Sequence, residues 1–281
     1  MKIQLGFDLT YQCVDSTPMI LMLNVHPSRA GDLITPDRLR ITPPRSITPF
    51  IDGFGNKCVR LLAPPGELRV ASDTVVADSG KPDLVDVAAQ EHAVADLPHD
   101  TLVYLLGSRY CETDTMMDKA WALFGSAPPG WRRVQAICDF VHQHITFGYQ
   151  YADARRGAAR AFAEQRGVCR DFTHLAVTFC RCLNIPARYC TGYLGDIGVP
   201  RDPAPMDFSA WFEAFVGGRW FTFDARHNMP RIGRVLIGRG RDAADVAIST
   251  TFGPNALKSF SVTTREADGP VVPADRQPMV A

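Results

Sequence analysis

The periodicity of the apolar residues changes once along the chain, close to Pro98, and this change most constrains the fold. Before it, short alternating or β-branched runs are separated by turn residues such as Asp52-Gly53 and Pro64-Pro65-Gly66, a pattern typical of antiparallel strands. After it, segments with a 3.6-residue period come first and runs with a period of two follow. The sequence therefore predicts an α+β protein that begins with an antiparallel β domain.

Two core-facing helices are predicted in the second part of the chain. Apolar residues recur on one helical face between Trp131 and Ile145, after the breaker Pro128-Pro129-Gly130. A second apolar stripe follows Cys169 and ends before Pro186. The runs with a period of two predict strands at 187–193, 208–216 and 219–224.

These patterns divide the chain into three parts. Residues 1–95 form the predicted β domain, and because they contain no clustered titratable groups we expect them to act as a scaffold or to bind a partner. Residues 96–265 form the mixed core that carries the chemistry. Residues 266–281, rich in proline, aspartate and alanine, are expected to be loosely ordered.

The composition limits the classes of partner. The 281 residues include 30 basic and 30 acidic side chains, so no net charge favours nucleic acid or an anionic membrane. The N-terminal residues lack an apolar signal region, and no stretch approaches the ~20 apolar residues of a membrane span. We expect a cytoplasmic protein that acts on a peptide, a protein or a small neutral ligand, and the sequence leaves its oligomeric state open.

Of the eight cysteines, Cys169 has a context that points to chemistry. It directly precedes the second helical stripe, where unpaired backbone N–H groups and the helix dipole favour a thiolate. The other cysteines are predicted to be reduced packing residues. Cys180 and Cys182 diverge on a helix, and no second ligand pair completes a tetrahedral set with Cys190, so we expect neither a metal nor a cofactor.

A predicted hairpin places other polar residues near this cysteine. Gly217-Gly218 is a two-residue turn signal, and a two-residue loop sets Val216 opposite Arg219. The same register sets Trp211 opposite Asp224 and Ser209 opposite Arg226, and all four side chains then share one face. Ser209 and Asp224 become diagonal neighbours at ~7–8 Å.

Three segments together resemble the transglutaminase-like superfamily. They are the helix start Gly167-Val168-Cys169-Arg170-Asp171-Phe172-Thr173-His174, the strand Asp207-Phe208-Ser209-Ala210-Trp211-Phe212-Glu213, and the strand Gly218-Arg219-Trp220-Phe221-Thr222-Phe223-Asp224. The resemblance covers about residues 160–228 and implies a papain-like core of helices packed on an antiparallel sheet. It also implies a cysteine nucleophile, a histidine base on the first strand and an orienting aspartate on the second, which correspond to Cys169, residue 209 and Asp224.

The chain departs from that pattern at the base, because position 209 holds serine. A serine hydroxyl cannot take the thiol proton or return it to a leaving amine, and the loss of a general acid–base typically costs ~10²–10⁴ in rate. Strand alternation puts His227 on the face opposite Ser209, so His227 could substitute only if the strand breaks after Asp224. Otherwise a polar residue in a surface turn is expected there.

We therefore hold two hypotheses of function. In the first, Cys169 attacks an amide to form a thioester that passes to water or an amine, with Asp224 as the orienting acid and Ser209 holding a water or substrate group. Substrate contacts are assigned to Trp211, Arg226 and Asp171, and Arg226 is also expected to favour the Cys169 thiolate. In the second, the domain is catalytically inactive and binds a peptide or protein in the same cleft.

Overall fold

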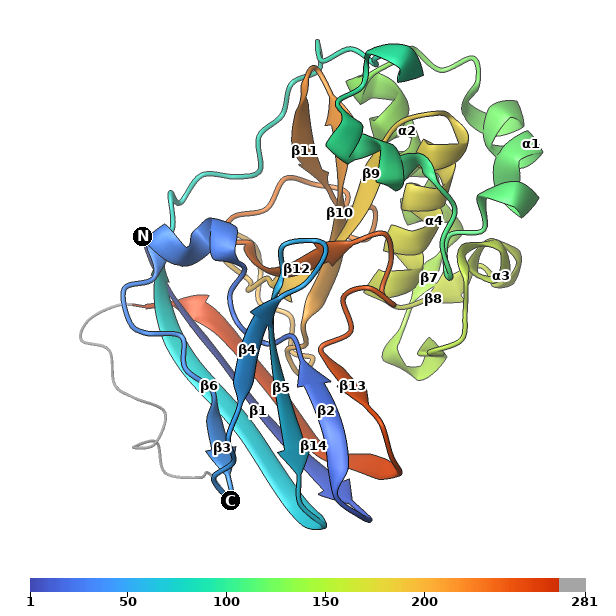
Figure 1. The fold of residues 1–281 in the computed structure, drawn as a ribbon. Helices are drawn as coiled ribbons and strands as arrows, with labels where there is room; N and C mark the ends of the chain where they lie inside the picture. Colours follow the sequence, from blue (N-terminus) through green and yellow to red (C-terminus); the bar gives the residue numbers. More distant parts are fainter. Residues whose placement is uncertain (268–281) are drawn as a thin grey trace.

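The computed structural model describes residues 1–267, so most of the segment 266–281 lies outside the described residues. The chain forms a β domain and a mixed core, as the change in periodicity predicts (Figure 1). The strands of the first part are β1 (Lys2–Cys13), β2 (Thr17–Leu21), β3 (Arg40–Thr42), β4 (Thr48–Ile51), β5 (Lys57–Ala63) and β6 (Gly66–Ala77).

The rest of the described chain contains four α-helices and the remaining strands, of which β13 and β14 join the β domain. The helices are α1 (Thr113–Phe124), α2 (Trp131–His144), α3 (Ala158–Glu164) and α4 (Cys169–Cys182). The strands are β7 (Thr146–Phe147), β8 (Arg166–Gly167), β9 (Ala187–Tyr193), β10 (Ser209–Val216), β11 (Arg219–Phe223), β12 (Val235–Gly240), β13 (Ser249–Thr251) and β14 (Asn255–Glu266). Short 3-10 turns are η1 (Pro27–Asp32), η2 (Val94–Asp96), η3 (His99–Leu105) and η4 (Tyr149–Tyr151). The predicted helices and strands of the core are confirmed to within a residue or two.

The β domain contains two four-stranded antiparallel sheets, with orders β14-β1-β6-β3 and β13-β2-β5-β4. Their outer strands β14 and β13 come from the end of the described chain. β14 pairs with β1 from Ile3 opposite Glu266 to Cys13 opposite Asn255. The sequence predicts residues 249–265 in the core, whereas β13 and β14 pair within the β domain. A local pattern carries no information about a pairing partner so distant in the chain.

The core is built around the sheet β11-β10-β9-β12. Helix α4 packs on β9 and β10, and α1, α2 and α3 pack around α4 (Figure 1). Buried apolar side chains of the helices and of Phe212, Ala214 and Val216 form one cluster. A second cluster fills the β domain and includes Tyr193 and Phe208 from the core, so apolar packing is continuous between the two parts.

The predicted hairpin register is confirmed over five pairs, from Val216 opposite Arg219 to Phe212 opposite Phe223. Gly217 and Gly218 have positive φ values of 59° and 76°, as a two-residue loop requires. The pairing stops at Phe223, so the predicted pairs of Trp211 with Asp224 and of Ser209 with Arg226 do not form as strand partners. The chain instead turns directly after Asp224.

The connection from β6 to η2 runs along this hairpin (Figure 1). Gly217 donates its N–H to the carbonyl of Gln90, and Gly218 donates to Nε2 of His92. This connection thereby ties the β domain to the side of the core sheet that bears β11. No helix within residues 1–267 has the length and apolar character needed to cross a membrane.

Candidate active site

Helix α4 begins at Cys169, and a buried carboxylate fixes its start. Asp171 Oδ2 accepts a hydrogen bond from the Val168 N–H at 2.8 Å and lies 3.2 Å from Nη1 of Arg156. The Asp171 side chain is 0% exposed. A substrate therefore cannot reach it, and the predicted substrate contact is corrected: Asp171 instead holds the turn that presents Cys169.

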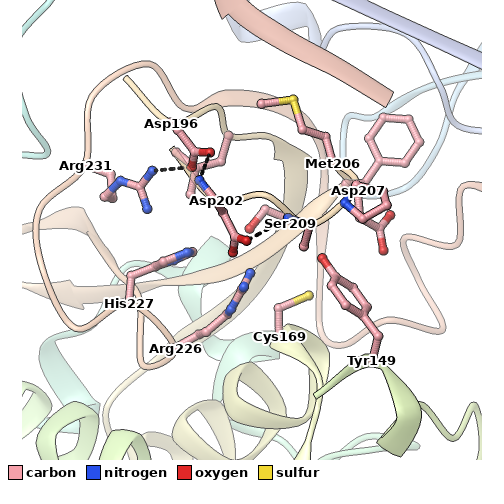
Figure 2. Close-up of a pocket in the computed structure, with 14 residues that line it drawn as sticks. Tyr149, Cys169, Asp196, Asp202, Met206, Asp207, Ser209, Arg226, His227 and Arg231 are labelled. Atoms are coloured by element: carbon pink, nitrogen blue, oxygen red, sulfur yellow. Dashed lines mark hydrogen bonds and ion pairs between the residues drawn. The ribbon is translucent and has the colours of Figure 1, made fainter. Parts of the chain in front are cut away.

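Cys169 lies in a pocket of about 60 Å³ built from four segments (Figure 2). Tyr149 comes from η4 and Cys169 from α4. The connection between β9 and β10 supplies most of the other walls and includes Asp202 and Asp207. The turn after β11 supplies Arg226 and His227. The pocket thus unites Cys169, Ser209 and Arg226, as the sequence predicts, and adds His227.

Burial controls the ionisation of Cys169. Removal from water raises the pKa of this thiol to about 11, against the opposing effects of the Arg226 charge and a hydrogen bond from the Ala210 N–H. Arg226 favours the thiolate, as expected, but desolvation outweighs both Arg226 and the Ala210 hydrogen bond, so the thiolate expected at this helix start is not the stable form. A neutral thiol in this position needs a base before it can attack a carbonyl.

Arg226 reaches the pocket from the turn rather than from a strand. Its guanidinium carbon lies 3.8 Å from the centre of the Phe147 ring, and its carbonyl accepts a hydrogen bond from Nδ1 of His142 at 2.8 Å. In Figure 2 the guanidinium lies between the ring of His227 and the sulfur of Cys169. It therefore provides positive charge beside the thiol, but as a guanidinium it accepts no proton.

Asp224 organises the turn that contains His227. Its Oδ1 accepts the backbone N–H groups of Arg226 and His227, both at 3.0 Å, and its Oδ2 lies 2.8 Å from Nδ1 of His227. Burial alone would raise the pKa of Asp224, but Arg234 and His227 outweigh it and hold that pKa well below its usual range. The ionised carboxylate requires a proton on Nδ1, which leaves Nε2 of His227 as an acceptor.

Ser209 lines the same pocket without joining this network. It is 7% exposed, and its Oγ has no hydrogen-bond partner among residues 1–267. Asp224 Oδ2 is instead occupied by His227 and by Arg234. Ser209 makes no hydrogen bond to the Asp224 carboxylate, and His227, from the turn after β11, makes that bond instead.

Trp211 does not line the pocket of Cys169. It is 2% exposed, and the guanidinium of Arg234 lies 5.2 Å from its ring centre. It borders a separate cavity together with Glu213 and Thr222. The predicted role of Trp211 in an acyl pocket is therefore corrected, because its ring packs against Arg234 and borders this other cavity.

Strand alternation predicts His227 on the face opposite Ser209 unless the strand breaks after Asp224. The strand pairing ends at Phe223, and the turn brings His227 to Asp224. The signal for the turn was an aspartate at the strand end, whose side chain can bind the following N–H groups. Arg234 and Asp83 contact each other across 151 positions of the chain, and no local pattern could reveal that contact. Within residues 1–267, no three histidine, cysteine or acidic side chains are grouped to hold a metal ion.

The arrangement of helix, sheet and pocket defines a class: α+β domains in which a cysteine at a helix start and a histidine bonded to an aspartate lie beside one antiparallel sheet, with the cysteine and the histidine lining one pocket. The sequence profile of the transglutaminase-like superfamily matches residues 120–225, and ends just before Arg226 and His227. The chain belongs to the transglutaminase-like superfamily. This assignment confirms the predicted family and the predicted α+β fold.

Similar proteins extend over almost the whole chain. A crystal structure of a candidate cysteine protease from Cytophaga hutchinsonii is 31% identical and has a TM-score of 0.81, with 97% of this chain and 93% of that chain covered. The uncharacterized protein ML0607 of Mycobacterium leprae is 26% identical over 224 residues, which is 75% of this chain and 77% of that protein. The uncharacterized protein Rv2569c of Mycobacterium tuberculosis is 25% identical over 256 residues, with 83% and 82% covered. These similarities support the general class of a transglutaminase-like protein related to cysteine proteases.

Proposed function

We propose that this protein is a cysteine-dependent enzyme that cleaves or transfers the acyl group of an amide in a peptide or protein, with Cys169 as nucleophile and His227 as base. One observation carries the proposal: the imidazole bonded to Asp224, 2.8 Å from Nδ1 to Oδ2, lines the same pocket as the thiol. His227 thus replaces the histidine that the resemblance expects at position 209.

The chemistry would follow from this division of roles. Nε2 of His227 takes the proton of the Cys169 thiol as the thiolate attacks the amide carbonyl, and then returns it to the departing amine. Asp224 keeps the proton on Nδ1 and stabilises the imidazolium. The backbone N–H of Cys169, at the start of α4, is unpaired within the helix and would stabilise the oxyanion. Water or a second amine then releases the acyl group from the thioester.

The raised pKa of the Cys169 thiol is consistent with this sequence of steps. Since the pKa of Cys169 is raised to about 11, the free protein holds a neutral thiol, and the proton leaves when a substrate carbonyl is present. Arg226 lowers the free energy of the emerging thiolate by its charge. We retain the cytoplasm as the proposed location.

A second candidate function is binding of a peptide without turnover. It is favoured by the position of Arg226, whose guanidinium lies between His227 and Cys169 in Figure 2. Catalysis would require this side chain to leave room for proton transfer, directly or through one water.

The two candidates are separated by assaying hydrolysis of fluorescein-labelled casein and incorporation of dansylcadaverine into casein. Wild type is compared with Cys169→Ala, His227→Gln and Ser209→Ala. We expect the first two variants to lose at least ~100-fold in rate, whereas Ser209→Ala stays within a few-fold of wild type. Full activity in His227→Gln contradicts the assigned base, and a wild type no faster than Cys169→Ala in both assays favours the binding module.

A further inference from the structure

Arg234 connects the Asp224–His227 pair to the segment that joins the two parts of the protein. Its Nη2 donates to Asp224 Oδ2 at 2.8 Å, and its Nε donates to Asp83 Oδ2 at 2.8 Å. The side chain is 6% exposed, and its guanidinium lies over the Trp211 ring. Arg234 is therefore a buried cation between two carboxylates, one of which holds the histidine.

Asp83 is itself fixed by the backbone of the turn that follows β11. Its N–H donates to the carbonyl of Arg231 at 2.9 Å, and its Oδ2 accepts the N–H of Arg231 at 2.9 Å. The Asp83 side chain is 14% exposed. Asp83, on the connection after β6, is thus held against the core by one hydrogen bond that it donates and one that it accepts. These bonds to the Arg231 backbone fix the position of its carboxylate independently of Arg234.

We infer that Arg234 and Asp83 are positioning residues that orient Asp224 and set the charge state of His227. The consequence for catalysis rests on the proposed function, but the electrostatic relationship does not. Oδ2 of Asp224 accepts hydrogen bonds from both Arg234 and His227. The guanidinium therefore restricts rotation of the carboxylate and directs the remaining acceptor site toward Nδ1.

Arg234 and Asp83 should have opposite effects on the stability of the His227 imidazolium. Loss of the guanidinium removes a buried cation and so favours a positive charge on His227. Loss of the Asp83 charge leaves the same cation less neutralised and so disfavours that charge. The other charged or titratable groups around the pair include Arg226 and Arg231 on the turn, Cys138 and Asp139 of α2, and Cys169 of α4. Tyr149, Asp196, Asp202 and Asp207 line the same pocket as His227.

The test is an NMR titration of His227 in the full-length protein. The resonance, one of seven histidines, is assigned by its loss in His227→Gln. We expect Arg234→Met to raise the titration midpoint by about one pH unit, Asp83→Asn to lower it by a smaller amount, and Arg234→Lys, which keeps the charge, to remain nearer to wild type than Arg234→Met.

An unchanged midpoint in Arg234→Met, or shifts of the same sign in Arg234→Met and Asp83→Asn, overturns the inference, because a merely structural role predicts no opposed shifts. If Arg234→Met does not fold, Asp83→Asn decides alone: a lowered midpoint supports the inference and any other result contradicts it. The titration needs no turnover. An active His227→Gln variant would therefore remove the proposed function while leaving opposed midpoint shifts, and the inference, in place.

Discussion

Nδ1 of His227 donates to Oδ2 of Asp224 at 2.8 Å, within the turn that begins where β11 ends. The aspartate thus keeps the position that the family resemblance gives it, while its histidine comes from the residues after it. Because the bond joins residues only three apart, it depends on the turn, and the turn depends on the two backbone N–H groups that Oδ1 accepts.

A paired substitution can test whether a histidine at position 209 replaces His227 as the base. We expect His227→Gln to lose activity and Ser209→His in that background to recover at least ~10-fold, since the site on Asp224 Oδ2 that His227 occupied is then open to an imidazole at 209, while Arg234 still donates to the same oxygen. Ser209→His alone should give no gain, because His227 already occupies that oxygen. Casein hydrolysis provides the measurement and Ser209→Ala the control. A paired variant no more active than His227→Gln would contradict the shared use of Asp224.

Alkylation of Cys169 should reveal a thiol with a raised pKa. With its pKa raised to about 11, the rate of carboxymethylation by iodoacetamide should increase about tenfold per pH unit between pH 7 and 10, because only the thiolate reacts. Arg226→Met should slow the reaction at each pH, since it removes a cation that favours the thiolate, whereas Arg226→Lys should not. Mass spectrometry distinguishes Cys169 from the other seven cysteines. A plateau reached below pH 8 would show instead that the free protein holds a thiolate.

The Asp224 charge should contribute to stability above pH 4. Its pKa is depressed in the folded protein relative to about 3.9 when unfolded, so its stabilisation is complete above that value and is lost as the pH falls toward the folded-state pKa. We expect Asp224→Asn to lower the free energy of unfolding at pH 7 by about 3 kcal/mol, and the difference between the two proteins to narrow progressively as the pH falls from about 4 toward the depressed folded-state pKa. Urea titrations at several pH values measure this difference.

The matched control for that experiment is Asp8→Asn. Asp8 pairs with Arg69 at the surface of the β domain, where an ion pair is worth about 1 kcal/mol or less. A loss in Asp224→Asn no larger than in Asp8→Asn would mean that the buried network adds nothing to stability.

Removal of the Asp171 carboxylate should loosen the start of α4. Asp171→Ala leaves the Val168 N–H unpaired and takes from Arg156 one of its two acidic partners, Glu164 being the other. We expect a loss of about 3 kcal/mol in unfolding free energy. Asp171→Asn, whose amide oxygen can still accept from Val168, should lose less. Equal losses in the two variants would show that the hydrogen bond at the helix start has no part in the effect.

The sequence by itself determined the elements and much of the local register. The alternating and helical periods identified β9, β10, α2 and α4, because burial of one face imposes the spacing of apolar residues. Gly217-Gly218 determined the hairpin, since only glycine adopts two consecutive positive φ values without strain. Cys169 at a helix start and Asp224 at a strand end followed from the same patterns and pointed to the family.

Tertiary structure decided which groups complete the site. Whether His227 faces Asp224 depended on where strand pairing stops, and it stops at Phe223 because the Asp224 side chain binds the next backbone N–H groups. The ionisation of Cys169 depended on its burial, which no position within a helix reveals. The contact of Arg234 with Asp83 and the pairing of β14 with β1 join residues far apart in the chain. A sequence pattern describes spacing along one element, whereas proximity between elements arises only when the whole chain packs.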